Sequence, residues 1–197
     1  MLVARELFGR EGLDLPMPAL ADAIGVGVGS LYRQIGSKDE LIAALVVERA
    51  LILRDRFEAS LEDADPWRAL VRVTHETVDD CIDDALSQTA WDEASFASAE
   101  VRQARAEATE SLARVVARAA RHGALRADVD HQDLRILFCS LRELSGLEPD
   151  SAHRLAELVL RGIRARREGD EDDAAASGAG AARQSSGERL AEPEQVP

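Results

Sequence analysis

The chain has 197 residues, a formal net charge of −13 and only two cysteines, Cys81 and Cys139. A chain of this length can bury a core without disulfides or structural zinc, and neither cysteine has a partner at zinc-ligand spacing. The longest apolar runs, such as Leu41 to Val47, are far shorter than the ~20 residues of a membrane span, and the N-terminus lacks the pattern of a signal peptide. These features exclude a disulfide scaffold and a membrane protein, and we expect a protein of the cytoplasm.

Helix signals recur along the whole chain, whereas β-branched and aromatic residues are sparse. Three short helices are expected over residues 2–12, 18–24 and 29–35. A longer fourth helix begins at Ser37, because Ser37 and Glu40 have the spacing of a capping box, in which each side chain bonds a free backbone N–H. Apolar residues at spacings of three and four predict that this helix continues to about Asp63.

The second half of the chain contains further helical patterns. Asp65-Pro66 predicts the start of a fifth helix that ends near Leu86. After a short segment with Trp91 and Phe96, later helices are expected over residues 100–121, after Asp130 and from Pro149. The sequence therefore predicts an all-α fold of about nine helices.

Residues 169–197 differ in composition from the rest of the chain. They are rich in alanine, glycine, serine, glutamate and proline, and they contain almost no large apolar side chain. Burial in such a segment does not offset the entropy lost on ordering. We therefore expect an acidic, disordered tail with a net charge of −5.

The most informative stretch runs from Ala21 to Leu41 and reads ADAIGVGVGSLYRQIGSKDEL. Apolar residues before and within it are expected to pack three short helices around one core, with Gly25 at the turn between the second and the third helix. This arrangement leaves an outer face on the third helix that is free to enter a major groove, formed by Val28, Ser30, Arg33 and Gln34.

This stretch resembles the DNA-binding domain of the TetR family of transcriptional regulators. The resemblance rests on Gly-Val-x-x-Gly-Ser-Leu-Tyr followed by Ser-Lys-x-Glu-Leu, and it is sharp over about the first fifth of the chain. The chain departs from the family in having Gln34, Ile35 and Gly36 where histidine, phenylalanine and proline are common. The resemblance implies a DNA-binding domain over residues 1–46 and a helical ligand-sensing and dimerisation domain over residues 47–168.

The resemblance also implies roles for individual residues. Gly27, Val28 and Ser30 match positions nearest the base edges, and Arg33 serves either bases or phosphates. The positions that hold phosphates are matched by Tyr32, Gln34 and Lys38. Alternatives for single residues are a packed core aromatic at Tyr32 and a solvated lysine at Lys38.

A ligand site in the second domain has weaker support. Thr74 interrupts an apolar stripe of the fifth helix that includes Val78 and Cys81, and the family builds its pocket wall where Trp91 and Phe96 lie. An equally weighted alternative is that the Thr74 hydroxyl bonds its own backbone one turn back. For Trp91 and Phe96 taken singly, core packing is the preferred role. All five residues are therefore candidate ligand contacts.

Metal binding and catalysis find little support in the sequence. His75, Asp79 and Asp83 share a helix face at four-residue steps, but a zincin motif needs a second histidine where Asp79 stands. The preferred interpretation of Asp79, Asp80, Asp83 and Asp84 is a solvated face. We expect no metal, no cofactor and no enzymatic activity.

By the resemblance, the protein is a homodimeric repressor that releases its DNA operator when a small molecule binds. Dimerisation is expected through apolar stripes on the last two helices, at Leu134, Leu137, Leu141, Leu144, Leu155, Leu158 and Gly162. The rival hypothesis is a helical interaction protein of the same fold that has lost DNA binding. Residues 1–50 support it with five basic and seven acidic residues, a net charge of −2. The family's first helix begins earlier, so we also expect either a native start upstream of Met1 or weak DNA binding.

Overall fold

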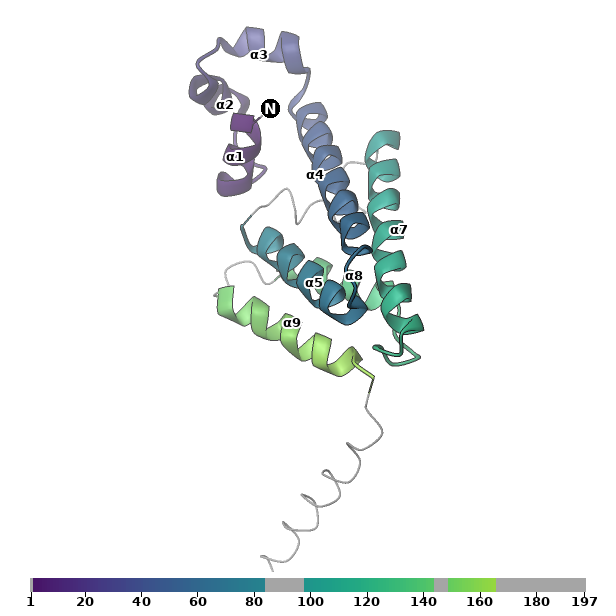
Figure 1. Ribbon diagram of the computed structural model, residues 1–197. Coiled ribbons are helices and arrows are strands. Elements are labelled where there is room, and N and C mark those ends of the chain that lie inside the picture. Colours follow the sequence, from purple (N-terminus) through teal and green to yellow (C-terminus); the bar gives the residue numbers. More distant parts are fainter. Residues whose placement is uncertain (1, 84–97, 144–148, 166–197) are drawn as a thin grey trace, which may run out of the picture. The chain divides into compact units, whose positions relative to one another are not determined.

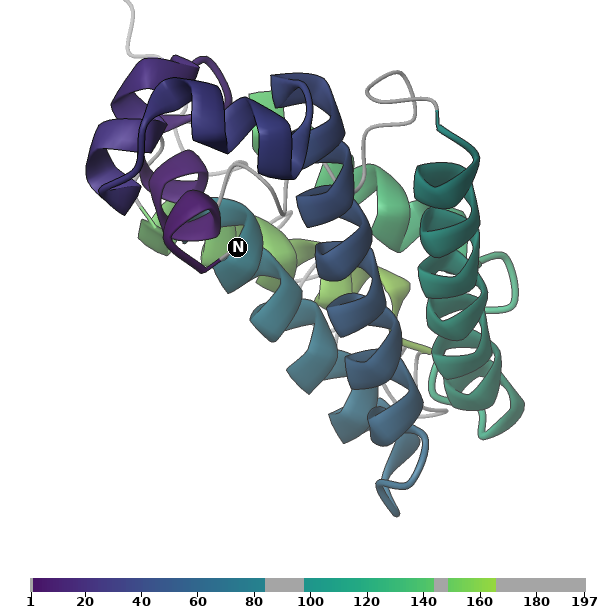
Figure 2. The same cartoon turned by 90° about the horizontal axis from the view of Figure 1, so that it is seen from above.

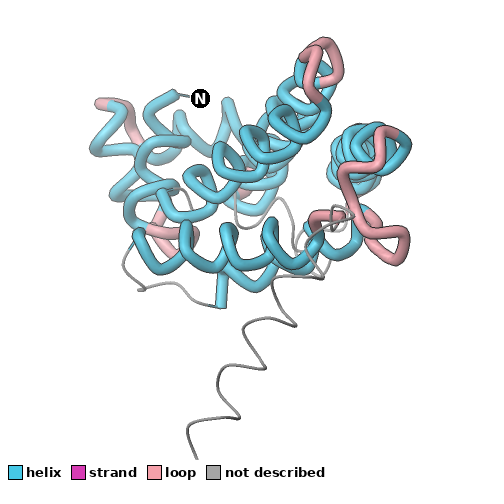
Figure 3. Tube along the Cα trace, turned by 60° about the horizontal axis from the view of Figure 1, so that its bottom comes forward, coloured by secondary structure: helices cyan, strands magenta, loops and turns pink. Residues whose placement is uncertain are grey.

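The computed structural model describes residues 2–83, 98–143 and 149–165 (Figure 1). Within these ranges every regular element is a helix, and the only strand-like pairing is one bridge between Leu125 and Arg164 (Figure 3). The helices are α1 (Leu2–Glu11), α2 (Met17–Ile24), α3 (Val28–Ile35), α4 (Lys38–Ser60), α5 (Pro66–Asp83), α7 (Ala99–Arg121), α8 (His131–Glu143) and α9 (Pro149–Ile163). The predicted all-α fold is confirmed. Trp91, Phe96, Leu144 and the predicted tail lie outside the described residues.

The capping box predicted at the start of α4 is present. The Ser37 hydroxyl accepts a hydrogen bond from the Glu40 backbone N–H at 3.1 Å, and the Glu40 carboxylate accepts one from the Ser37 backbone N–H at 2.7 Å. Gly36, just before the box, has a φ of +82°, and a Cβ there would collide with the Glu40 carboxylate. Glycine at this position therefore allows the chain to turn sharply from α3 into a capped α4.

Two separate apolar cores lie along α4. The head core joins α1, α2 and α3 to the first half of α4, and it consists of Ala4, Phe8, Met17, Leu20, Ala21, Leu31, Leu41, Ile42, Leu45, Val46 and Val101. Val101 is fully buried in it, although this residue comes from the first turn of α7. The second half of α4 contributes Leu53 and Phe57 to the other core.

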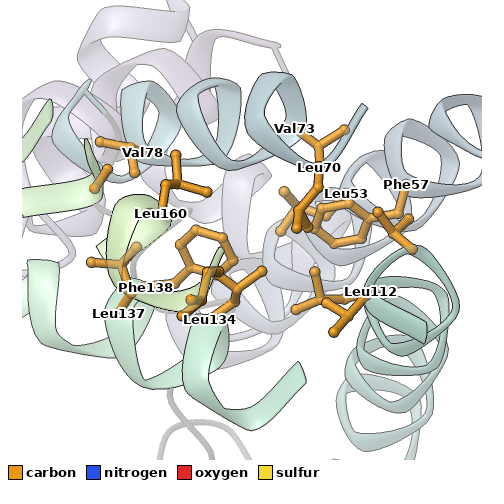
Figure 4. Close-up of a cluster of buried hydrophobic side chains, with 14 of the residues drawn as sticks. Leu53, Phe57, Leu70, Val73, Val78, Leu112, Leu134, Leu137, Phe138 and Leu160 are labelled. Carbon is orange, nitrogen blue, oxygen red and sulfur yellow. The ribbon is translucent and has the colours of Figure 1, made fainter. Parts of the chain in front are cut away.

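This second cluster, the body core, packs α5, α7, α8 and α9 together with the end of α4. Figure 4 shows its side chains pointing toward one another from these helices. Its largest fully buried members are Phe57, Phe138, Leu53, Leu70, Leu112 and Leu134. Each such side chain stabilises the fold by roughly 1.5–3 kcal/mol relative to its exposed state.

Helices α4 and α7 run parallel and lie side by side over much of their length (Figure 2). Polar contacts between the two helices join residues whose numbers differ by a nearly constant amount. Arg54 donates to Glu107 at 2.9 Å, and Glu58 accepts bonds from Ser111 and Arg114. The parallel register explains how the first turn of α7 reaches the head core.

The acidic face predicted for α5 is only partly solvated. Asp80 is half-buried and binds two arginines of α4, with Arg49 and Arg56 each 2.5 Å away. The prediction of a solvated carboxylate is therefore wrong for Asp80. The difference arises because α4 lies against this face of α5 and presents arginines to it about three and five turns from its start.

The leucines predicted for dimerisation are mostly used within the chain. Leu134, Leu137 and Leu141 are buried in the body core, where α5 covers α8. The prediction that these three remain available to a second copy is wrong, since one chain already covers them. The large apolar side chains that stay exposed on α8 and α9 are Ile136 at 63% and Leu158 at 57%.

A pair of histidines joins α5 to α9. Nδ1 of His75 lies 3.3 Å from Nδ1 of His153, while the outer Nε2 atoms lie 3.0 Å from Glu157 and 2.8 Å from Asp79 respectively. The ring centroids are 5.6 Å apart, which equals the N–N distance plus about two ring radii. The two Nδ1 atoms therefore meet head-on, as in an N–H···N hydrogen bond.

The histidine pair lies between two carboxylates, those of Glu157 and Asp79. Neighbouring charges on the same two helices are Arg72 and Glu76, which pair at 3.5 Å, and Arg161, which lies 3.6 Å from Glu157.

We expect the contact between His75 and His153 to stabilise the packing of α5 against α9. A double-mutant cycle with His75→Ala and His153→Ala should give a coupling free energy of about 1 kcal/mol, measured by urea unfolding.

The pair Arg54 and Glu107, whose side chains bond at 2.9 Å between α4 and α7, provides a positive control for the same measurement. A coupling free energy of zero for the histidine pair would contradict the contact between the two rings.

Candidate nucleic-acid interface and ligand cavity

Helices α2 and α3 are joined by a tight turn at Gly25. This residue has a φ of +79°, and its backbone N–H bonds the carbonyls of Ala21 and Asp22. A left-handed residue after the last helical turn is best occupied by glycine. The turn sets α3 across the end of the head, next to the start of α4 (Figure 1).

The faces of α3 follow from its helical spacing. Leu31 is 1% exposed, while Val28 and Ile35, three residues before and four after it, are half-buried against the head core. Val28, predicted on the outer face, thus lies at the edge of the inner face and shows only part of its side chain. The exposed outer face consists of Tyr32, Arg33 and Gln34, with Ser30 half-exposed.

Ser30 and Arg33 are bonded to each other. The Arg33 guanidinium donates to Ser30 Oγ at 2.9 Å, along one turn of α3. A guanidinium has five N–H donors, so this bond orients Arg33 and leaves donors free for a guanine edge or a phosphate. The two residues predicted nearest to the bases thus form one polar unit.

Gly27 precedes the first turn of α3 and is exposed. Its φ of −68° suits any residue, and a Cβ added to it would meet nothing within 4 Å. Neither backbone conformation nor packing in the free protein therefore requires glycine here. Close approach of the backbone to another molecule is a physical reason for a missing side chain at this position.

Tyr32 and Lys38 stand on either side of the turn from α3 into α4. Tyr32 is 47% exposed, so it is not the core aromatic of the alternative interpretation. Lys38 is half-buried in the first turn of α4. They are the only tyrosine and the only lysine of the chain. Both residue types bind phosphate oxygens in protein–DNA complexes.

Two acids of the head are already engaged within the protein. The Ser37 backbone N–H holds the pKa of Glu40 below its ordinary value, and Glu48 lies 3.6 Å from Arg5. These carboxylates face the capping box and α1. They therefore oppose an approaching phosphate less than the formal charge of the head indicates.

The predicted ligand contacts on α5 are buried in the body core. Thr74 Oγ1 donates to the Leu70 carbonyl at 2.8 Å, as the backbone alternative predicted, while Val78 and Cys81 pack among apolar side chains. The structure brings these three together on α5 but gives them no open space in the cavity described next. Trp91 and Phe96 lie outside the described residues.

A cavity of about 700 Å³ lies instead between α4, α7 and α8. Its lining combines small apolar side chains with three arginines, namely Ala50, Ala106 and Ala113 with Arg102, Arg105 and Arg135. None of these cavity residues was predicted as a ligand contact from the sequence. The sequence feature that could have indicated the cavity is a stripe of alanine and arginine at helical spacing on α7. This pattern is equally typical of a solvated helix face.

The described part of the chain contains no group of three side chains placed to hold a metal ion. His75, the first residue of the unfavoured metal set, contacts Glu157 and His153 instead of Asp79. No described helix is both long and apolar enough to cross a membrane.

Both halves of the chain match known protein families. Residues 1–45 match the family described as bacterial regulatory proteins, tetR family. Residues 65–165, about half of the chain, match the C-terminal domain of SbtR-like transcriptional regulators. The chain belongs to the TetR family. It is thus a DNA-binding transcription regulator with a helix-turn-helix and not an enzyme, as predicted.

Solved TetR structures support this assignment. TetR transcriptional regulator SCO0520 from Streptomyces coelicolor is 28% identical, with a TM-score of 0.62 over 84% of this chain and 97% of that one. A TetR regulatory protein from Mycobacterium vanbaalenii is 27% identical, with a TM-score of 0.57 over 83% and 91%. PfmR from Thermus thermophilus, at 23% identity, a TM-score of 0.61 and coverage of 80% and 94%, shares the fold. No curated protein matches the chain.

We expect Lys38→Ala to weaken binding to operator and to random duplex DNA by a similar factor. A phosphate contact carries no sequence information, so its loss should also reduce the slope of log affinity against log salt by about one. Tyr32→Phe should likewise weaken both, whereas changes at Ser30 and Arg33 should alter the preferred site. Fluorescence anisotropy with labelled duplexes measures these effects.

Arg10→Ala is the matched control, because Arg10 is an exposed cation on α1. It should change affinity less than Lys38→Ala. Since Lys38 is the only lysine, amine-reactive labelling followed by mass spectrometry reports on this side chain and the N-terminus alone. Labelling of Lys38 that is unaffected by saturating DNA would contradict the contact.

Gly27→Ala should separate DNA binding from folding. The added methyl meets free space in the protein, so the free energy of unfolding should change by less than about 1 kcal/mol. Operator affinity should fall at least several-fold, because the methyl occupies the space between the start of α3 and the DNA. Unchanged operator affinity would show that DNA does not approach Gly27.

Proposed function

We propose that this TetR protein is a homodimeric repressor that binds operator DNA and releases it when a small molecule enters the second domain. Residues 1–46 form the DNA-binding domain, residues 47–168 the sensing and dimerisation domain, and residues 169–197 a tail. The observation that carries the proposal is the outer face of α3. Its polar side chains point away from the head core and end beside Lys38 on α4.

In the proposed complex, α3 lies in the major groove. Ser30 and Arg33 read base edges, with Val28 reaching a thymine methyl through its exposed part, and Gly27 lets the backbone approach closely. Tyr32, Gln34 and Lys38 bind phosphates and fix the register of the helix. Two heads related by a two-fold axis reach successive major grooves about 34–36 Å apart.

The coupling between ligand and DNA runs through α4 and α7. Both helices line the cavity at Ala50 and Ala106, and both contribute to the head core. A ligand that separates them shifts the head relative to the body and changes the distance between the two heads. It weakens DNA binding only to the extent that it binds the released conformation better than the DNA-bound one.

Dimerisation is proposed through the exposed parts of α8 and α9. Ile136 and Leu158 are large apolar side chains that one chain leaves uncovered. Such side chains gain stability when a second copy removes them from water. Dimerisation is typical of TetR regulators, which supports this assignment.

The proposal predicts a two-fold symmetric operator. Selection from a random duplex pool should return inverted repeats with half-site centres about 10 base pairs, or a multiple of this, apart. Ile136→Glu with Leu158→Glu should give monomers in sedimentation velocity and lose preference for the repeat. Both side chains are exposed, so the variant should stay folded.

The same measurements test the rival hypothesis of a helical interaction protein. Its motivation is the net charge of −2 over residues 1–50. A wild-type protein without salt-dependent affinity for duplex DNA would favour this rival and reject the repressor. A monomeric wild type would reject the dimer.

A further inference from the structure

We infer that the cavity between α4, α7 and α8 binds an amphipathic organic anion, a molecule with an acidic group at one end and an apolar body. The inference rests on the proposed function, because it names the chemical class of effector for the same regulator. It is carried by the charge, the volume and the apolar lining of this cavity.

The charge of the lining is positive. Arg102 and Arg105 come from adjacent turns of α7, and Arg135 faces them from α8. Glu110 is the only acidic side chain among the described lining residues, which leaves a formal charge of +2. Arginines bind carboxylate and phosphate groups through two parallel N–H donors.

These arginines can hold a ligand while keeping contacts within the protein. Arg135 donates from Nε to the Gln132 side chain at 3.0 Å, which orients the guanidinium plane. A guanidinium carries five N–H donors, so an anion adds to such a contact without displacing it. His131, Gln132 and Thr109 add further polar groups to the same lining.

The rest of the lining is apolar and made of small side chains. Ala50 and Leu53 of α4 face Ala106 and Ala113 of α7, and alanines at these positions leave space that larger side chains would fill. The volume of about 700 Å³ lies within the ~300–1,000 Å³ typical of small-molecule sites. An apolar ligand body gains from leaving water here.

The two parts of the lining together restrict the ligand. A neutral apolar molecule would cover the arginines and remove their water without replacing it, which is unfavourable. An inorganic anion would pair with the arginines but leave the alanines in contact with water. A molecule with both parts satisfies the whole lining.

The test uses the full chain without DNA. Binding of the fluorescent anion 1-anilinonaphthalene-8-sulfonate should be saturable, and decanoate should displace it at concentrations about ten-fold or more below those of 1-decanol. Decyltrimethylammonium should compete no better than 1-decanol. Arg105→Gln with Arg135→Gln should remove the preference for decanoate and leave competition by 1-decanol unchanged.

Two further variants locate the effect. Arg154→Gln with Arg161→Gln removes the same two charges from exposed positions on α9 outside the cavity lining, and this variant should bind decanoate as the wild type does. Ala106→Trp fills the cavity from an exposed position and should weaken binding of both the fluorescent anion and decanoate. Circular dichroism and thermal unfolding check that each variant is folded.

Several outcomes would overturn the inference. These are absence of saturable binding, equal competition by decanoate and 1-decanol, a preference that survives loss of both arginines, and full binding by Ala106→Trp. A separate mobility-shift assay with operator and decanoate tests the release mechanism. Decanoate that binds as expected but leaves operator affinity unchanged would support the anion site and reject decanoate-driven release.

Discussion

The structure depends on one helix that belongs to two cores. The first half of α4 packs with α1, α2 and α3, and its second half packs with α5 and α7. A packed helix transmits displacement because close-packed side chains have little free volume in which to absorb it. Any change that moves α4 against α7 therefore reaches both the DNA-binding surface and the body. Contacts such as that of Arg54 with Glu107 fix the parallel register of these two helices. The interface between α4 and α7 is therefore the main connection between the head core and the body core.

The acidity of the chain is compatible with binding a polyanion because much of it is internally compensated. In the body, Asp63, Asp80 and Glu107 each contact arginines of neighbouring segments, so these charges act mainly on one another. At separations beyond ~8–10 Å at physiological salt, what remains of their field is screened. The local groups on α3 and at the start of α4 therefore decide whether phosphates bind, rather than the net charge of −13.

Features that depend on near neighbours in sequence were predictable, and those that depend on distant segments were not. Ser37 and Glu40 are three residues apart, so their capping box follows from local chemistry. The family motif likewise placed the helix-turn-helix. By contrast, the partners of Asp80 and His75 come from other helices, and helical periodicity alone does not show that one chain covers Leu141. The cavity could not be predicted from the sequence for a further reason, because it arises where small side chains of different helices leave space.

The burial of Val101 in the head core has a consequence for how such regulators recombine. A DNA-binding domain over residues 1–46 would leave behind one of the side chains that complete its own core, because Val101 belongs to α7. A chimera that carries this domain onto a foreign body would leave a gap in the head core unless the new body offers an apolar side chain at the matching turn. Exchange of operator specificity therefore depends in part on a position more than 50 residues beyond the domain that reads the DNA.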